Sequence, residues 1–176
     1  DIMKRNGFFG PGGEVNITNL STAEITGASK IIDCAVGPEE TWSIIDEKRS
    51  KVYTYDSEGN LLFIFGDKGQ QLGNISSIEA IAYLDDDILV LDKTMDAVSV
   101  FRRTEYGDLL LSAIRNTNER NYDTTIDYWT EILKRNNNFD TAYIGIGKSL
   151  YRSAQYEESL DYYKSAYDNK NYSESY

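Results

Sequence analysis

The sequence TWSIID at 41–46, followed by VYTY at 52–55, recurs about 46 residues later as DILVLD at 87–92, followed by VSVF at 98–101. Polar and apolar residues alternate through much of both copies, which is typical of short β-strands with one buried face. A period in the forties built on such strands indicates consecutive β-meanders, the unit of a propeller blade. The first half of the chain is therefore expected to form part of a β-propeller.

The second half repeats with a shorter period. Three residues of one pattern recur roughly 34 positions later: Tyr122, Trp129 and Ile132 correspond to Tyr156, Tyr163 and Ala166. From residue 108 the apolar positions follow the 3.6-residue period of a helix, which predicts four helices over about 107–119, 122–136, 140–153 and 156–168. A period of 34 built on helix pairs indicates tetratricopeptide hairpins.

These patterns predict an α+β chain with three parts. Residues 1–30 form an irregular segment that is rich in Gly, Asn, Ser and Thr, with one possible strand at 14–18. Residues 31–105 form two antiparallel meanders, with strands expected at 31–36, 41–45, 51–55 and 61–65 and then at 78–83, 88–91 and 97–101. The second meander lacks a fourth strand, which leaves an unpaired edge through which two copies of the chain could associate. Residues 106–176 form an all-α array of helical hairpins.

Charge and composition disfavour several classes of function. The net charge is −11 and spreads over both halves, and no Lys/Arg cluster could follow a phosphate backbone, so nucleic acid and anionic lipid are poor partners. No stretch approaches the roughly 20 apolar residues that cross a bilayer, so no direct membrane contact is expected of this segment. The absence of histidine removes the commonest general base and the usual zinc ligands. We therefore expect no catalytic residues, no metal and no cofactor.

Individual residues add little to this chemistry. Cys34, the single cysteine, lies in the apolar run at 31–36 and is expected to be a small buried hydrophobic residue, with a reactive thiol as the alternative. The three aspartates at 85–87 could bind Ca²⁺, but they lack the spacing of a dedicated calcium loop, so a solvated turn is expected.

The segment WSIIDEKRSKVYTYDSEGNL at 42–61 resembles the NHL repeat, a family of propeller blades, and the resemblance extends over 31–101. It matches the family's order of strand, Asp, polar turn, basic-Val strand and Asp-x-x-Gly hairpin, although Ala97 replaces the basic residue in the second copy. The resemblance implies that Asp46 and Asp92 are structural carboxylates bonded to turn amides. The alternative role for them is metal ligation.

The second half resembles tetratricopeptide repeats over 106–171. The better copy is carried by eight residues: Tyr143, Ile146, Gly147, Leu150, Tyr156, Ser159, Tyr163 and Ala166. The resemblance implies that Gly147 allows two helices to approach closely. It also implies that Ile144, Lys148 and Tyr151 line a concave groove that binds a protein or peptide partner, with core packing as the alternative role for each of them.

Propeller strands followed by tetratricopeptide helices are similar to the extracytoplasmic part of some bacterial membrane proteins of the Yip family. The chain begins and ends within its patterns, so we expect it to be a fragment of a larger cell-envelope protein, tethered by a membrane segment outside these residues. The alternative location is the cytoplasm. The expected function is a non-enzymatic protein–protein interaction scaffold. The alternative is an incomplete piece of a propeller enzyme or sugar-binding protein whose site needs further blades.

Overall fold

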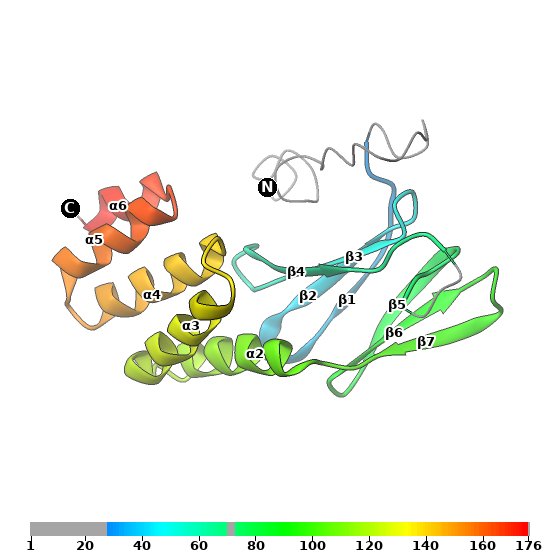
Figure 1. Cartoon of the computed structure of the whole chain (residues 1–176), viewed down its shortest axis with the longest axis horizontal. Helices are drawn as coiled ribbons and strands as arrows, with labels where there is room; N and C mark the ends of the chain where they lie inside the picture. The colour runs from blue at the N-terminus through cyan, green and yellow to red at the C-terminus, as the bar shows by residue number, and fades with distance from the viewer. Residues whose placement is uncertain (1–27, 70–72, 176) are drawn as a thin grey trace. The chain divides into compact units, whose positions relative to one another are not determined.

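The structure is a computed structural model that describes residues 28–69 and 73–175. The chain is an α+β protein that divides into two compact units, Asp1–Arg102 and Arg103–Tyr176. The first unit contains two small antiparallel sheets and the second contains five α-helices (Figure 1). The strand predicted at 14–18, and nearly all of the irregular segment predicted at 1–30, lie outside the described residues.

The first sheet is a four-stranded antiparallel meander. Its strands are β1 (Ile31–Val36), β2 (Trp42–Asp46), β3 (Lys51–Tyr55) and β4 (Leu61–Phe65), with a short 3-10 helix η1 (Pro38–Glu40) between β1 and β2. A turn built on Asp56 joins β3 to β4, since its Oδ1 accepts hydrogen bonds from the amides of Glu58 and Asn60. Gly59 occupies the left-handed region at φ 82°, where glycine is favoured. The hairpin predicted from this turn sequence is confirmed.

The second sheet repeats the first but ends one strand earlier. Its strands are β5 (Ile78–Leu84), β6 (Asp87–Asp92) and β7 (Ala97–Phe101), in the order β5-β6-β7. The positions where a fourth strand would follow carry a short link and then a helix. The prediction of an incomplete second meander is thus confirmed for the residues that the structure describes.

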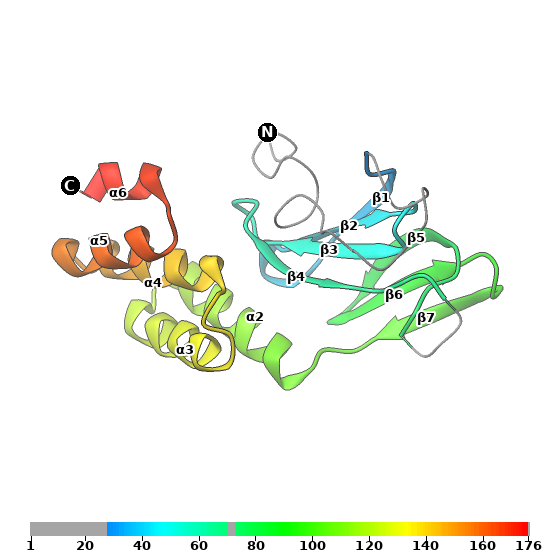
Figure 2. The same cartoon turned by 45° about the horizontal axis from the view of Figure 1, so that its top comes forward.

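The two sheets pack face to face, and Figure 2 shows them as two layers. Their shared core includes Ile45 and Val52 from the first sheet and Ile81 and Val90 from the second. One polar network crosses this core, because the hydroxyl of Ser43 lies 2.6 Å from those of both Thr54 and Tyr83. A backbone amide also crosses it, where Ile81 donates to the Asp33 carboxylate at 3.0 Å.

Asp46 and Asp92 hold equivalent turns in the two sheets. Asp46 Oδ1 accepts hydrogen bonds from the amides of Lys30, Lys48 and Arg49. The Asp92 carboxylate accepts from the amides at the positions one repeat later: Ser76, Thr94 and Met95, with Ser77 as a fourth donor. Both carboxylates are buried. The structural role that the resemblance implied for them is confirmed, because turn amides, together with the Arg49 guanidinium at Asp46 Oδ2, occupy the oxygens that a metal would need.

The prediction that Cys34 is buried is wrong. Strand β1 is irregular between Ile31 and Asp33, and beyond that point Asp33 faces the second sheet, where it binds the Ile81 amide. Because side chains alternate along a strand, Cys34 then faces outward and is exposed. A shift of one residue in a bulge exchanges the two faces of a strand, and the apolar run at 31–36 carries no signal for it.

The second unit contains five helices in its described part, one more than predicted. They are α2 (Glu105–Asn118), α3 (Tyr122–Arg135), α4 (Asp140–Arg152), α5 (Tyr156–Ser165) and α6 (Asn169–Ser175). Extensive contacts join only helices that are consecutive in the chain. The additional helix, α6, comes from a polar stretch that lacks the apolar period on which the other four predictions depend.

Equivalent turns end α2 and α4, one 34-residue period apart. Arg120 and Ala154 both adopt the left-handed conformation, with φ 63° and 61°. The next amide in each turn donates back to the helix: Asn121 N to the Asn116 carbonyl at 2.8 Å, and Gln155 N to the Leu150 carbonyl at 2.9 Å. These bonds satisfy carbonyls at the helix ends and reverse the chain, so both helix pairs are antiparallel hairpins with the same turn geometry.

Candidate partner-binding surface

The three residues predicted to contact a partner lie on one side of α4. Ile144, Lys148 and Tyr151 are spaced by four and three residues, which places them on one helix face. Ile144 and Lys148 are half-buried and Tyr151 is exposed. The opposite face carries Ile146 and Leu150, which are buried. The row 144/148/151 is therefore the open side of an amphipathic helix.

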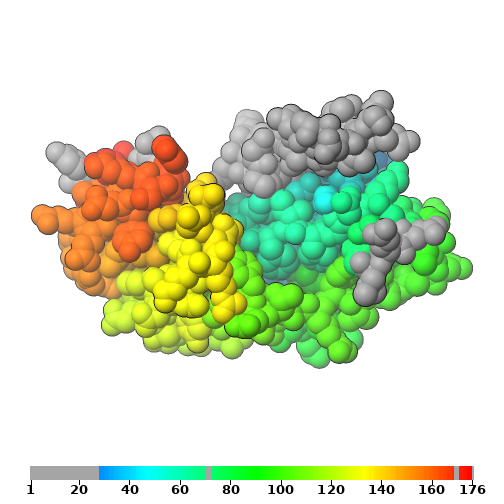
Figure 3. Space-filling model, in the orientation of Figure 1, coloured from blue at the N-terminus to red at the C-terminus, as the bar shows by residue number. Residues whose placement is uncertain are grey.

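Two glycines allow α4 to pack closely against α3 and α5. Because glycine has no Cβ atom, an aromatic ring of the neighbouring helix can lie against the backbone of α4 at each position. A Cβ atom added at Gly147 would lie 2.6 Å from Cε1 of Tyr163 on α5. A Cβ at Gly145 would collide with the Trp129 indole of α3. The close approach predicted at Gly147 is confirmed, and Gly145 provides a second one that sequence reasoning missed. On the surface of α4, the row 144/148/151 lies between the side that packs on α3 at Gly145 and the side that packs on α5 at Gly147. The space-filling view shows α3, α4 and α5 as one continuous surface (Figure 3).

Aromatic side chains extend the row onto α5. The rings of Tyr151 and Tyr156 meet edge to face with their centroids 5.3 Å apart, and both side chains are exposed. On the same hairpin Tyr143 contacts Tyr162 at 6.4 Å. An exposed pair of tyrosines offers a partner both apolar ring surface and hydroxyl groups that can form hydrogen bonds.

The equivalent row on α2 is largely buried and offers no comparable surface. The positions one repeat before Ile144 and Lys148 are Leu110 and Ile114, and both are buried. The next position, Thr117, uses its hydroxyl to donate to the Ala113 carbonyl at 2.8 Å. Of these two equivalent rows, only the one on α4 is available to a partner, together with the tyrosines of α5 that contact it.

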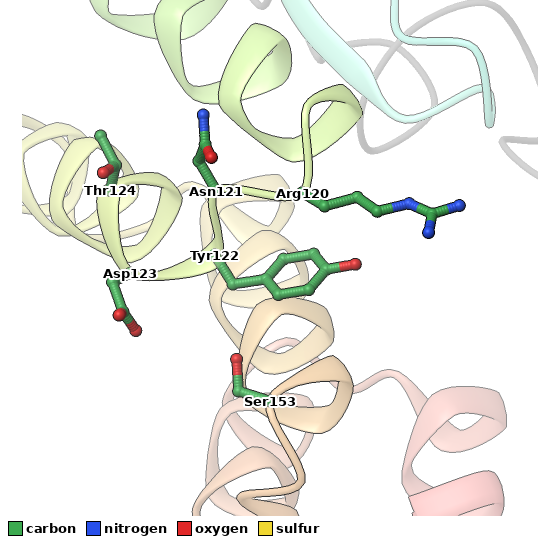
Figure 4. A pocket seen from close by; sticks show the side chains of 6 residues that line it. All are labelled: Arg120, Asn121, Tyr122, Asp123, Thr124 and Ser153. Carbon is green, nitrogen blue, oxygen red and sulfur yellow. The ribbon is translucent and has the colours of Figure 1, made fainter.

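A polar pocket with a volume of about 340 Å³ lies between the turn after α2 and the end of α4. Its lining comprises Arg120, Asn121, Tyr122, Asp123, Thr124 and Ser153 (Figure 4). Arg120 and Tyr122 point to one side, whereas Asp123 and Thr124 point to the other. Sequence reasoning missed this pocket. Its one signal in the sequence is the 34-residue repeat, which makes the turns at residues 120 and 154 equivalent, and the pocket lies between these two turns. Its open, polar character suits water or a polar side chain better than a buried ligand.

Burial raises the pKa of Tyr163 to about 12, and this links the stability of the helices to pH. An unfolded tyrosine ionises near pH 10, so the folded state favours the neutral phenol. The stabilisation is complete below about pH 10 and is lost as the pH rises through about 12. We expect Tyr163→Phe to keep its helical circular dichroism at a higher pH than the wild type. Equal alkaline midpoints for the two proteins would contradict this linkage.

No family model matches the chain, and no curated protein is similar enough to be counted as a relative. Within the residues that the structure describes, no group of three or more Cys, Asp or Glu side chains is placed to hold a metal ion. None of the described helices combines the length and the apolar character needed to cross a bilayer.

Proposed function

We propose that this chain is a non-enzymatic scaffold for protein–protein interaction, composed of NHL-like blades followed by tetratricopeptide-like helices. The observation that carries the proposal is the open row 144/148/151 on α4, which ends on the exposed pair Tyr151–Tyr156. Equivalent turns at Arg120 and Ala154 support a helical repeat, and equivalent turns at Asp46 and Asp92 support repeated blades.

The partner that suits this surface is a protein segment with acidic and apolar side chains. Lys148 supplies positive charge in the middle of the row, and Ile144 and Tyr151 supply apolar area on both sides of it. Helical repeats commonly bind extended peptides or single helices along such a row. Tyrosine is also among the residues that dominate binding energy at interfaces, so Tyr151 is expected to be the main contact.

The double variant Lys148→Glu/Tyr151→Ala tests this proposal. Partners captured from a native lysate by the full chain are compared with those captured by the variant, and Lys134→Glu on α3 serves as a control that changes an exposed lysine elsewhere. We expect the double variant to lose a protein partner by at least about tenfold in affinity, roughly 1.4 kcal/mol, while the control retains it. A partner that both variants retain equally would refute binding at the row, and turnover of a small molecule without any protein partner would refute the scaffold.

We further propose that the chain lies outside the cytoplasm and is tethered through a membrane segment that these residues do not include. The support is the resemblance to the extracytoplasmic part of Yip-family proteins. Protease added to intact cells that express the parent protein, followed with an antibody to this segment, tests the location. Degradation without lysis is expected. Protection until lysis would instead favour a cytoplasmic adaptor.

A further inference from the structure

The short link between the last strand and the first helix carries two adjacent arginines. β7 ends at Phe101 and α2 begins at Glu105, so Arg102, Arg103 and Thr104 lie outside the strands and the helices (Figure 1). The division into two compact units falls between the two arginines. A cut in this link would therefore separate the units and leave every described strand and helix intact.

The backbone on both sides of the arginines suits an endopeptidase, which binds its substrate as an extended strand. On one side, β7 is the last strand in the order β5-β6-β7, so one edge of its backbone is free within the described residues. On the other side, Thr104 is extended, with φ −88° and ψ 169°. The third residue of α2 is Gly107, and glycine so close to a helix end favours opening of the first turn.

The arginines of the link form ion pairs with exposed carboxylates. Nε of Arg102 lies 3.4 Å from Oδ2 of Asp87, and the Arg102 side chain is 83% exposed. Nε of Arg103 lies 3.2 Å from Oδ1 of Asp108, whose side chain is 60% exposed. Ion pairs this open to water contribute little to stability, so the carboxylates of a protease pocket can replace them.

The two other pairs of adjacent basic residues in the described part of the chain are held in folded backbone. Lys48 and Arg49 lie in the turn between β2 and β3, where both amides donate to Asp46 Oδ1 and the Arg49 side chain is only 9% exposed. Lys134 and Arg135 are the last residues of α3, and a helix must unwind before it can enter a protease cleft. Of these three pairs, only the one in the link presents an extended backbone.

We propose that the link is a cleavage site for an endopeptidase that recognises paired basic residues, with Arg102 and Arg103 bound in two of its carboxylate-lined pockets. Hydrolysis consumes one water and breaks the peptide bond between Arg103 and Thr104, which leaves a carboxylate on Arg103 and an amine on Thr104. The products are residues 1–103 and 104–176. The row 144/148/151 belongs to the second product, so cleavage releases it from the sheets. The cleavage site depends on the link alone and is independent of what the row binds.

Incubation of the full chain with a subtilisin-like endopeptidase specific for paired basic residues, followed by intact mass measurement, tests the proposal. We expect residues 104–176 to be the first product of a cut within the described residues. Arg103→Gln is expected to slow its appearance at least about thirtyfold, since a buried charge pair in the protease pocket is lost. Arg102→Lys is the matched control, because it keeps a basic pair and should still be cut.

Gly107→Ala tests the role of the backbone while both arginines stay unchanged. Alanine favours the helical first turn of α2, so the open form that enters the protease becomes rarer. We expect the folded variant to be cut about two- to fivefold more slowly than the wild type, the factor that corresponds to the difference in helix propensity. Equal rates would show that the first turn of α2 does not limit access to the link.

Three results would overturn the proposal. The first is a first cut within the described residues that falls after Arg49 or Arg135. The second is formation of residues 104–176 from Arg103→Gln as fast as from the wild type. The third is a folded chain that stays uncut under conditions in which a peptide of residues 97–110 is cut after Arg103, because the link would then be inaccessible. Circular dichroism of each variant confirms that the substituted chain is folded.

Discussion

Asp46→Asn is expected to lower the free energy of unfolding of the sheet unit by about 3–5 kcal/mol, the usual cost of breaking a buried ion pair by removing one partner. Asp46 is 0% exposed, and its Oδ2 lies 2.8 Å from Nη1 of Arg49, whose side chain is itself almost buried. Asparagine keeps one oxygen for the turn amides, but it leaves the guanidinium without its carboxylate. Urea unfolding followed by Trp42 fluorescence measures the effect in the full chain with Trp129→Phe, which makes Trp42 the sole tryptophan.

Asp92→Asn is the matched control for this prediction. Asp92 is bound by the same kind of turn amides, but Met95 stands in the position of Arg49, so within the described part of the chain Asp92 has no ion pair to break. The expected loss is only about 1–2 kcal/mol, the cost of an impaired buried hydrogen bond. Equal losses for the two variants would show that the amides, and not Arg49, account for the stability of the Asp46 turn.

Gly147→Ala is expected to destabilise the helical unit by about 2 kcal/mol, although alanine is the better helix former by about 1 kcal/mol. The added methyl would lie 2.6 Å from Cε1 of Tyr163, a separation that real Cβ atoms do not adopt. Because Tyr163 is buried, its ring cannot move aside without separating α4 from α5. Urea unfolding followed by circular dichroism at the helical minimum measures the loss.

Gly107→Ala shows what the same substitution does without a collision. Gly107 lies in α2, and the nearest atom to an added Cβ is the Arg103 Cβ at 3.5 Å, an ordinary contact. The helix propensity of alanine should then act alone and stabilise the unit by about 0.5–1 kcal/mol. If both variants were stabilised alike, the close packing of α4 on α5 would be refuted.

Local patterns predicted the elements of this fold but not the exposure of their faces. Strand and helix periods located seven strands and four helices within one or two residues at most ends, because each period reports which positions an element can bury. The role of Asp46 was predicted from the resemblance to the NHL repeat, and it is correct because a carboxylate next to a tight polar turn has amides within reach. Cys34 was not, because a bulge determines which face it occupies, and nothing in an apolar run specifies a bulge.

Surfaces made by two segments were the least predictable. The row 144/148/151 was predicted from the tetratricopeptide resemblance, which gave no sign that Leu110 and Ile114, at the equivalent positions of the first copy, are buried. The pocket at Arg120 and Ser153 requires two turns to come together. The outer face of the second sheet has the same apolar alternation as the covered faces. Its exposure depends on the absence of a neighbouring sheet, which no local pattern reports.

The restriction of extensive contacts to consecutive helices has a consequence for how the second unit is made during synthesis. The extensive contacts of this unit join helices that are neighbours in the sequence, so its contact order is low and its formation is expected to be fast. Each helix can dock on the one before it as the chain leaves the ribosome, without waiting for a distant segment. The same order governs opening in the native state: amide protons of α6, which has one neighbour, should exchange with solvent sooner than those of α4, which has two.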